Sequence, residues 1–174
     1  VFRSDHAAPP TFLERSTAGV FRRDPTVTRD ALVANWVTDA AVVYIGKADH
    51  GRLRARLREY VSYGRGANVG HRGGRLIWQL AEAEELVVAW RLLAPNIVPK
   101  EVEDGMIIAF ASACGQPPFA NDPHLLGRIS GSRGSAAGTS PTAGLAGIRR
   151  PGGEPNAAAA RYGWCRALGP QGTA

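Results

Sequence analysis

The chain has 174 residues and a formal net charge of +6, and 44% of its residues are hydrophobic. That length suits one domain of ordinary size with extensions, and no apolar run approaches the ~20 residues that a membrane-spanning helix needs. The two cysteines, Cys114 and Cys165, are too few and too far apart for a disulfide framework or a zinc site. No secretory leader is visible. We therefore expect a cytoplasmic protein that does not enter a membrane.

The N-terminal region predicts little regular structure apart from one short helix. Residues 1–3 fit the end of a first strand, and loop-type residues with two adjacent prolines follow over residues 4–10. Thr28 is typical of a helix N-cap. We therefore predict a short helix that follows Thr28 and extends through Asn35.

The next predicted elements are a strand and a helix. Residues 40–45 form a short apolar run rich in β-branched and aromatic residues, which favours a buried strand. Gly46 then lets the backbone turn. Leu53, Leu57 and Val61 recur every four residues, which is the spacing of one helix face. The sequence thus predicts a helix from Leu53 with an apolar stripe.

Two further strands and a second long helix are predicted downstream. Residues 75–80 and 85–91 have strand-like composition and are joined by an acidic turn, so they form a candidate hairpin. Pro99 suits the first position of a helix, acidic residues in its first turns complement the helix dipole, and Gly115 suits its end. The apolar face of this helix comprises Val102, Met106, Ile107 and Phe110.

Beyond Pro123 the composition changes to glycine, alanine, serine and proline, with few large apolar residues before Trp164. Such a segment buries too little apolar surface to offset the entropy lost on ordering. We therefore predict a domain over residues 1–122 and a low-complexity, disordered tail over residues 123–174. The tail's arginines either remain solvated or add nonspecific affinity for nucleic acid.

Positive charge is concentrated in the centre of the chain. Residues 43–75 hold one lysine and seven arginines against Asp49 and Glu59, a balance of +6. The five glycines between Gly64 and Gly74 allow backbone amides to approach an anionic backbone closely. This stretch is typical of a surface that attracts phosphate.

Motifs in the same part of the chain are similar to the second half of the GIY-YIG nuclease signature. Tyr44-Ile45-Gly46-Lys47-Ala48 resembles the YxGKA element of the incision domain of bacterial excision-repair nucleases, and Leu53, Arg56 and Tyr60 reproduce its L-x-x-R-x-x-x-Y spacing. Glu103-x-x-Met106-Ile107 and Pro118-Phe119-Ala120-Asn121 follow in the family's order. The resemblance covers roughly Val42 to Asn121, which is under half of the chain.

The resemblance implies a small α+β fold, in which a three- to four-stranded antiparallel sheet is flanked by helices. It also implies a metal-dependent DNA endonuclease that uses Mg²⁺ or Mn²⁺, with DNA as its partner and no small-molecule organic cofactor. The oligomeric state is left open. The alternatives are a nucleic-acid-binding module on the same fold that does not cleave, and a fragment without function.

Cleavage of a phosphodiester requires a neutralised phosphate, a positioned water and a stabilised leaving oxygen. By resemblance, the catalytic set is Tyr44, Lys47, Arg56, Tyr60 and Asn121, and the metal ligand is Glu103. The lysine and arginine would bind phosphate, the tyrosines would orient or deprotonate a water, and the carboxylate would hold the metal. Each residue taken alone is ordinarily a core or surface position, so the hypothesis depends on their order. Further contacts to nucleic acid are predicted at Arg52, Arg54, Arg58, Arg65, His71, Arg72 and Arg75.

The first family motif, Gly-Ile/Val-Tyr, is the main departure from the pattern. Gly19-Val20-Phe21 has its shape, but it ends 23 residues before Tyr44 and its phenylalanine lacks the hydroxyl. The other possibility is that the true motif preceded Val1 and that residues 4–39 are an insertion between strands.

Overall fold

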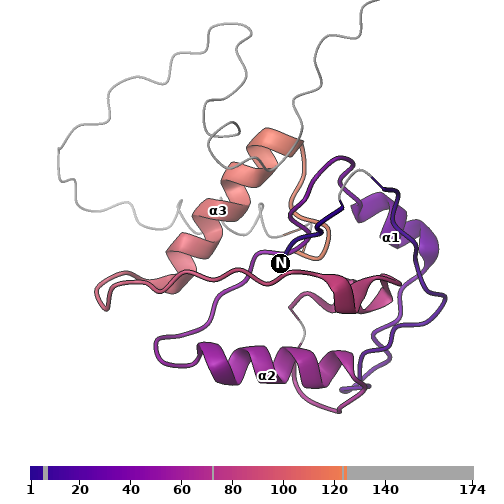
Figure 1. Ribbon diagram of the computed structural model, residues 1–174, viewed down its shortest axis with the longest axis horizontal. Coiled ribbons are helices and arrows are strands. Elements are labelled where there is room, and N and C mark those ends of the chain that lie inside the picture. Colours follow the sequence, from indigo (N-terminus) through magenta and orange to yellow (C-terminus); the bar gives the residue numbers. More distant parts are fainter. Residues whose placement is uncertain (6–7, 72, 123, 125–174) are drawn as a thin grey trace, which may run out of the picture.

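The structure is a computed structural model, and it describes residues 1–5, 8–71, 73–122 and 124. Its regular elements are three α-helices, α1 (Arg29–Asn35), α2 (Leu53–Gly64) and α3 (Pro99–Cys114), and two 3-10 helices, η1 (Arg75–Gln79) and η2 (Ala83–Glu85). Figure 1 shows that long irregular segments connect these helices. Of the tail predicted over residues 123–174, all but His124 lies outside the described residues.

The three predicted helices are confirmed, together with the signals that delimit two of them. The side chain of Thr28 accepts a hydrogen bond from the backbone N–H of Ala31 at 3.3 Å, so it caps α1. Pro99 occupies the first turn of α3, where its missing N–H costs nothing. Gly115 ends α3 with φ +84°, a left-handed conformation that glycine adopts without a steric penalty.

The predicted α+β fold is wrong. Within the part of the chain that the structure describes there is no strand, and therefore no three- to four-stranded sheet for helices to flank. Antiparallel pairing is limited to isolated bridges, which join Phe2 to Val42 and to Val87, Phe12 to Leu80, and Phe21 to Arg23.

The predicted strand over residues 40–45 is buried but not part of a ladder. Val43 and Ile45 are buried, as the apolar run predicts. The backbone N–H and C=O of Ile45, however, bond to the side-chain amide of Asn121 at 2.9 and 2.8 Å. The carbonyl of Val43 accepts from the backbone of Ala120. Because these partners from a distant part of the sequence satisfy the backbone groups, no neighbouring strand is required.

The predicted hairpin over residues 75–80 and 85–91 also fails. Residues 75–79 coil into η1 after Gly74, which has φ +71°. The carbonyl of Trp78 accepts from Thr17, and the backbone of Gln79 bonds to Leu13, so these groups pair with the N-terminal loop. Residues 86–91 are extended, but among them only Val87 forms a bridge.

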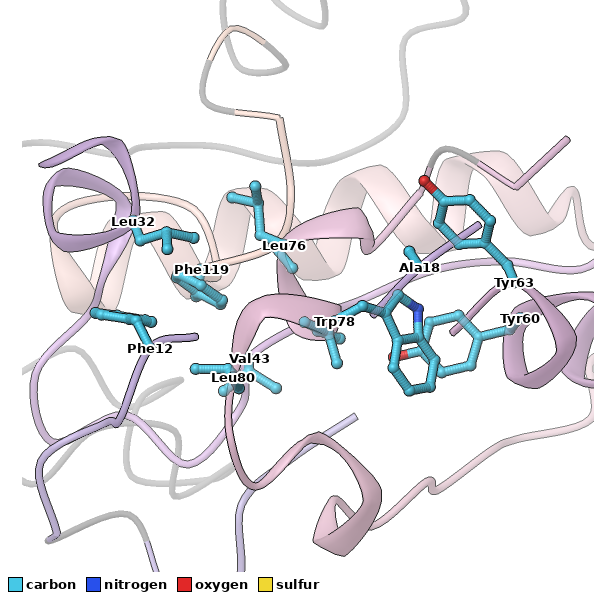
Figure 2. Close-up of a cluster of buried hydrophobic side chains, with 12 residues drawn as sticks. Phe12, Ala18, Leu32, Val43, Tyr60, Tyr63, Leu76, Trp78, Leu80 and Phe119 are labelled. Atoms are coloured by element: carbon cyan, nitrogen blue, oxygen red, sulfur yellow. The ribbon is translucent and has the colours of Figure 1, made fainter. Parts of the chain in front are cut away.

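Two groups of buried side chains hold the helices together. The main core joins the N-terminal loop, α1, α2, η1 and the segment after α3, and its members are Phe12, Ala18, Leu32, Val43, Tyr60, Tyr63, Leu76, Ile77, Trp78, Leu80, Phe119 and Ala120. A second core seats α3 and comprises Val37, Ala40, Ile45, Ile107 and Phe110. Figure 2 shows the indole of Trp78 beside the ring of Tyr60, and the two ring centroids are 4.8 Å apart.

The buried face of α2 is not its apolar stripe. A stripe of leucine and valine ordinarily faces the core, but here the buried residues of α2 are Tyr60, Tyr63 and Gly64. Gly64 is needed for this orientation, because a methyl group in its place would lie 2.3 Å from the Trp78 ring. Val61, at the end of the stripe, remains 40% exposed.

Candidate functional site

A cavity of about 620 Å³ lies between the loop of residues 44–51, one side of α2, the extended segment 88–93 and the first half of α3. Five of the six residues assigned catalytic or metal-binding roles line it, namely Tyr44, Lys47, Arg56, Tyr60 and Glu103. They lie up to 59 positions apart in the sequence. We call this cavity the central cavity.

Two tyrosines that line the central cavity lie beside a pair of glycines. The Tyr44 ring and the Tyr60 ring both approach Gly74 so closely that a methyl group there would lie 3.3 Å from each. A methyl group at Gly73 would lie 2.5 Å from the Tyr44 hydroxyl. The two glycines therefore leave the space that the Tyr44 side chain occupies.

Both tyrosines are neutral at physiological pH. Burial first, and then the charge of Glu103, raise the pKa of Tyr44 to about 12, while the charge of Arg56 opposes the rise. Burial, and then the neighbouring Tyr44, raise the pKa of Tyr60. A neutral phenol donates a hydrogen bond but does not accept a proton from water. The two phenols are therefore suited to orient a water or a phosphate by hydrogen bonding, and they are not suited to deprotonate a water.

Arg56 projects from α2 and already has an anionic partner. Its guanidinium contacts the Glu59 carboxylate at 3.2 Å, and Arg52 contacts the other oxygen of the same group at 3.5 Å. The Arg56 side chain is 38% exposed, so this pair is partly solvated and its net stabilisation is modest. A phosphate entering the central cavity would compete with Glu59 for a bidentate partner.

Glu103 is the carboxylate of α3 that faces the central cavity. Burial raises its pKa, and the charges of Lys100 and Lys47 oppose the rise while Asp104 adds to it. Its contact with Lys100 is long, 4.0 Å, because that ammonium is bonded to Asp104. The carboxylate is thus partly desolvated and only weakly paired, a state that a nearby cation would stabilise.

The donor set is compatible with magnesium or manganese bound through one protein carboxylate. Over the described ranges, no three histidine, cysteine, aspartate or glutamate side chains form a metal-binding group. Magnesium commonly keeps several waters and takes one or two carboxylates plus phosphate oxygens of the substrate. Glu103 fits that mode of binding.

Lys47 lies at the edge of the central cavity and is held by its neighbour in sequence. Its ammonium contacts the Asp49 carboxylate at 2.6 Å, and their side chains are 34% and 70% exposed. Such an exposed pair is weak and easily exchanged. Lys47 is therefore available to an anion at this rim.

His71 was predicted as a loop residue that contacts DNA, but it is 4% exposed. It lines the central cavity, with its ring edge-on to Tyr60 at 5.3 Å between centroids. Neither ring nitrogen has a hydrogen-bond partner of good geometry among the described residues. Burial first, and then Arg56, lower its pKa to about 4, while Glu59 and the backbone of Gly73 oppose the change. The imidazole is therefore neutral.

Asn121 does not line the central cavity. It is 7% exposed, and its amide is used in two hydrogen bonds to the backbone of Ile45. Those bonds hold the segment that presents Tyr44. In this structure Asn121 is a positioning residue.

The predicted nucleic-acid-binding arginines do not share one surface. Arg54 and Arg58 lie on α2 along the groove formed by the apolar stripe, outside the central cavity. Arg65 is exposed at the end of α2, and Arg75 is half-buried at the start of η1. Arg72 lies outside the described residues.

Sequence reasoning missed the contribution of the extended segment 88–93. Trp90 and Arg91 line the central cavity, as does His50, whose ring bonds to the carbonyl of Ile97 at 3.1 Å. The adjacent aromatic and cationic side chains of Trp90 and Arg91 are the available signal, but the composition of residues 85–91 predicts a hairpin strand instead.

The candidate first motif lies apart from this site. Val20 and Phe21 are 58% and 42% exposed, and neither lines the central cavity. Gly19 packs against the carbonyl of Ala67. The Gly19-Val20-Phe21 segment therefore adds no side chain to the candidate site.

None of the helices in the described ranges has the length and apolar character needed to cross a bilayer. In comparisons with known proteins, no protein-family model, no curated protein and no solved structure matches this chain.

Proposed function

We propose that this protein is a metal-dependent DNA endonuclease whose phosphodiester chemistry takes place in the central cavity. One observation supports the proposal above all. A single cavity is lined by motif residues from two distant parts of the sequence. These residues are Tyr44, Lys47, Arg56 and Tyr60 from the first part and Glu103 from the second. The proposal concerns the site and does not depend on the predicted sheet.

Each side chain would have a role in the reaction that follows from its charge. Arg56 and Lys47 would bind the scissile phosphate in place of Glu59 and Asp49, because both existing ion pairs are partly exposed. The neutral phenols of Tyr44 and Tyr60 would donate hydrogen bonds to the phosphate or to the attacking water. Bound metal would be held by Glu103, and it would supply positive charge and an acidified water.

A second candidate is binding of DNA without cleavage. The raised pKa values of Tyr44 and Tyr60 favour it, since neither phenol serves as a general base near neutral pH. His71 is neutral but buried among Tyr60, Tyr63 and the cavity wall. In this alternative the same cations hold the backbone, and no water is activated.

A plasmid-nicking assay across Mg²⁺ concentrations separates the two candidates. Arg56→Ala should lower the nicking rate by about 10²- to 10³-fold, which is typical for the loss of one preorganised electrostatic group. Glu103→Gln should abolish the metal-dependent activity. It should leave binding in chelator intact or make it slightly tighter, because one anion is removed from a site for phosphate.

The matched controls are substitutions of one arginine and one glutamate that lie outside the central cavity. Arg29→Ala removes a cation from the exposed face of α1, and Glu101→Gln removes a carboxylate from the exposed face of α3. Both should nick at the parental rate. Equal nicking by all four variants would contradict the assignment of the site. Binding without nicking by the parent protein, with every metal tried, would establish the second candidate.

A further inference from the structure

The apolar stripe of α2 lines an open groove on the surface. Leu53, Leu57 and Val61 form one side of a shallow groove of about 520 Å³, and Trp90 forms the other. The extended segment that carries Trp90 runs alongside α2 (Figure 1). We call this feature the tryptophan groove.

Trp90 is unusually exposed for its size. Its side chain is 65% exposed, while Trp78 in the main core is 6% exposed. Indole is the side chain with the largest apolar and aromatic surface, and it is ordinarily buried or placed at an interface. An exposed indole above an apolar stripe provides a flat surface for a planar ligand.

Two arginines give the tryptophan groove its charge. Arg54 and Arg58 line it, lie one helical turn apart and are exposed. Neither makes an ion pair within the described part of the chain, whereas Arg52 and Arg56 share Glu59. Among the described residues, no acidic side chain lines the groove. A polyanion with flat apolar groups is the ligand that matches this combination.

We propose that the tryptophan groove binds an unpaired stretch of DNA, with a base stacked on Trp90 and the adjacent phosphates on Arg54 and Arg58. Trp90 also lines the central cavity, so a strand held in the groove continues directly towards Arg56 and Glu103. This inference rests on the proposed function and narrows its substrate to DNA with unpaired nucleotides next to the cleaved bond. Bases in a duplex are stacked on each other and do not offer a free face to the indole.

The test is fluorescence anisotropy with labelled oligothymidine and with a duplex of equal length, in chelator and at fixed salt. The parent protein should prefer the single strand. Trp90→Ala should weaken single-strand binding by about 5- to 150-fold, because stacking of one base contributes ~1–3 kcal/mol, and should leave duplex binding nearly unchanged. Trp90→Phe should retain part of the affinity. Arg54→Ala should reduce the slope of log K against log salt by about 0.7.

A matched control is Phe21→Ala. Phe21 is also an exposed aromatic beside an arginine, since Arg22 lies 5.3 Å from its ring centroid, but it is outside both the groove and the central cavity. Its removal should not change single-strand affinity. Quenching of tryptophan emission by oligothymidine gives a second readout, and it should be lost in Trp90→Phe.

Equal affinity of the parent and Trp90→Ala for oligothymidine would overturn this inference, as would absence of any single-strand binding; a protein partner or a second copy of the chain would then be the candidate occupant. If the parent protein nicks DNA but Trp90→Ala binds single strands as tightly as the parent, the stacking role of Trp90 is refuted and the proposed endonuclease activity is retained. If single-strand binding depends on Trp90 but the parent protein does not nick DNA, the endonuclease activity is refuted and the stacking role of Trp90 is retained.

Discussion

The neutral, buried His71 predicts a specific loss of stability in mild acid. Its pKa is lowered from 6.5 to about 4 in the folded chain, whereas the unfolded chain titrates near the ordinary value. The folded state therefore binds the proton less readily than the unfolded state. The resulting stability is fully present above pH 6.5 and is lost as the pH falls towards 4.

The magnitude follows from the size of the shift. A difference of about 2.5 pKa units at about 1.36 kcal/mol per unit corresponds to about 3 kcal/mol. The group is 4% exposed, so solvent screening does not remove this effect. A loss of this size is large against the ~5–15 kcal/mol that stabilises an ordinary domain.

Urea denaturation at a series of pH values measures this loss. His71→Phe keeps an aromatic ring beside Tyr60 and removes the titrating group, and His71→Leu provides a second apolar replacement. The parent protein should lose about 3 kcal/mol more than either variant between about pH 7 and pH 4.

Other groups cancel in that comparison, because they titrate in all three chains. The amino group of Val1, with its pKa lowered to about 6, loses its contribution as the pH falls from 8 to about 6. Glu103, with a raised pKa, has the opposite sign and favours the folded state as the pH falls. Parallel pH profiles for the parent and both variants would refute the conclusion that burial keeps His71 neutral.

Two further predictions concern packing and buried hydrogen bonds. Gly64→Ala should destabilise the protein by about 1–3 kcal/mol in urea denaturation, because the added methyl lies 2.3 Å from the Trp78 ring. A methyl group added at Gly105 in α3 has no atom within 4 Å, so Gly105→Ala should instead stabilise the protein by about 0.5–1 kcal/mol. Stabilisation by both substitutions would contradict the predicted clash. Gln79→Leu should cost at least about 2 kcal/mol, because its buried amide makes three hydrogen bonds to the backbone of Leu13 and Val27, and these backbone groups would lose their partner. Gln116→Leu breaks one such bond and should cost less; equal losses would show that the amide of Gln79 is not essential.

The sequence by itself determined the helices, because their signals are local. Thr28 provides a side-chain oxygen to the first turn of α1, Pro99 suits the start of α3, and Gly115 suits its end. Each of these effects acts within one helical turn. Such signals do not depend on what the rest of the chain does, so they could be recognised without the tertiary structure.

Most of the residues to which the sequence assigns catalytic or metal-binding roles line the central cavity. The order Tyr44, Lys47, Arg56, Tyr60 and Glu103 was sufficient to place these residues in one hypothesis, and the structure brings them together. It could not indicate that Arg56 pairs with Glu59. That contact depends on which face of α2 is turned to the central cavity.

Only the tertiary structure decided which backbone conformation the apolar runs adopt. Residues 40–45 and 75–80 are buried or half-buried, as their composition predicts, but a short buried run is compatible with strand, extended chain or helix. The outcome depends on which distant groups satisfy the backbone. Here the side chain of Asn121 and the loop of residues 11–17 provide those partners, so no sheet is needed.

The tertiary structure likewise decided which face of α2 is buried. The leucine and valine stripe has the better apolar periodicity, yet the tyrosine face carries rings that pack on Trp78 and His71. Burial of those large aromatic surfaces removes more area from water than burial of the stripe would. The stripe is therefore left at the surface beside Trp90, a juxtaposition of residues from separate parts of the chain that their local sequences do not predict.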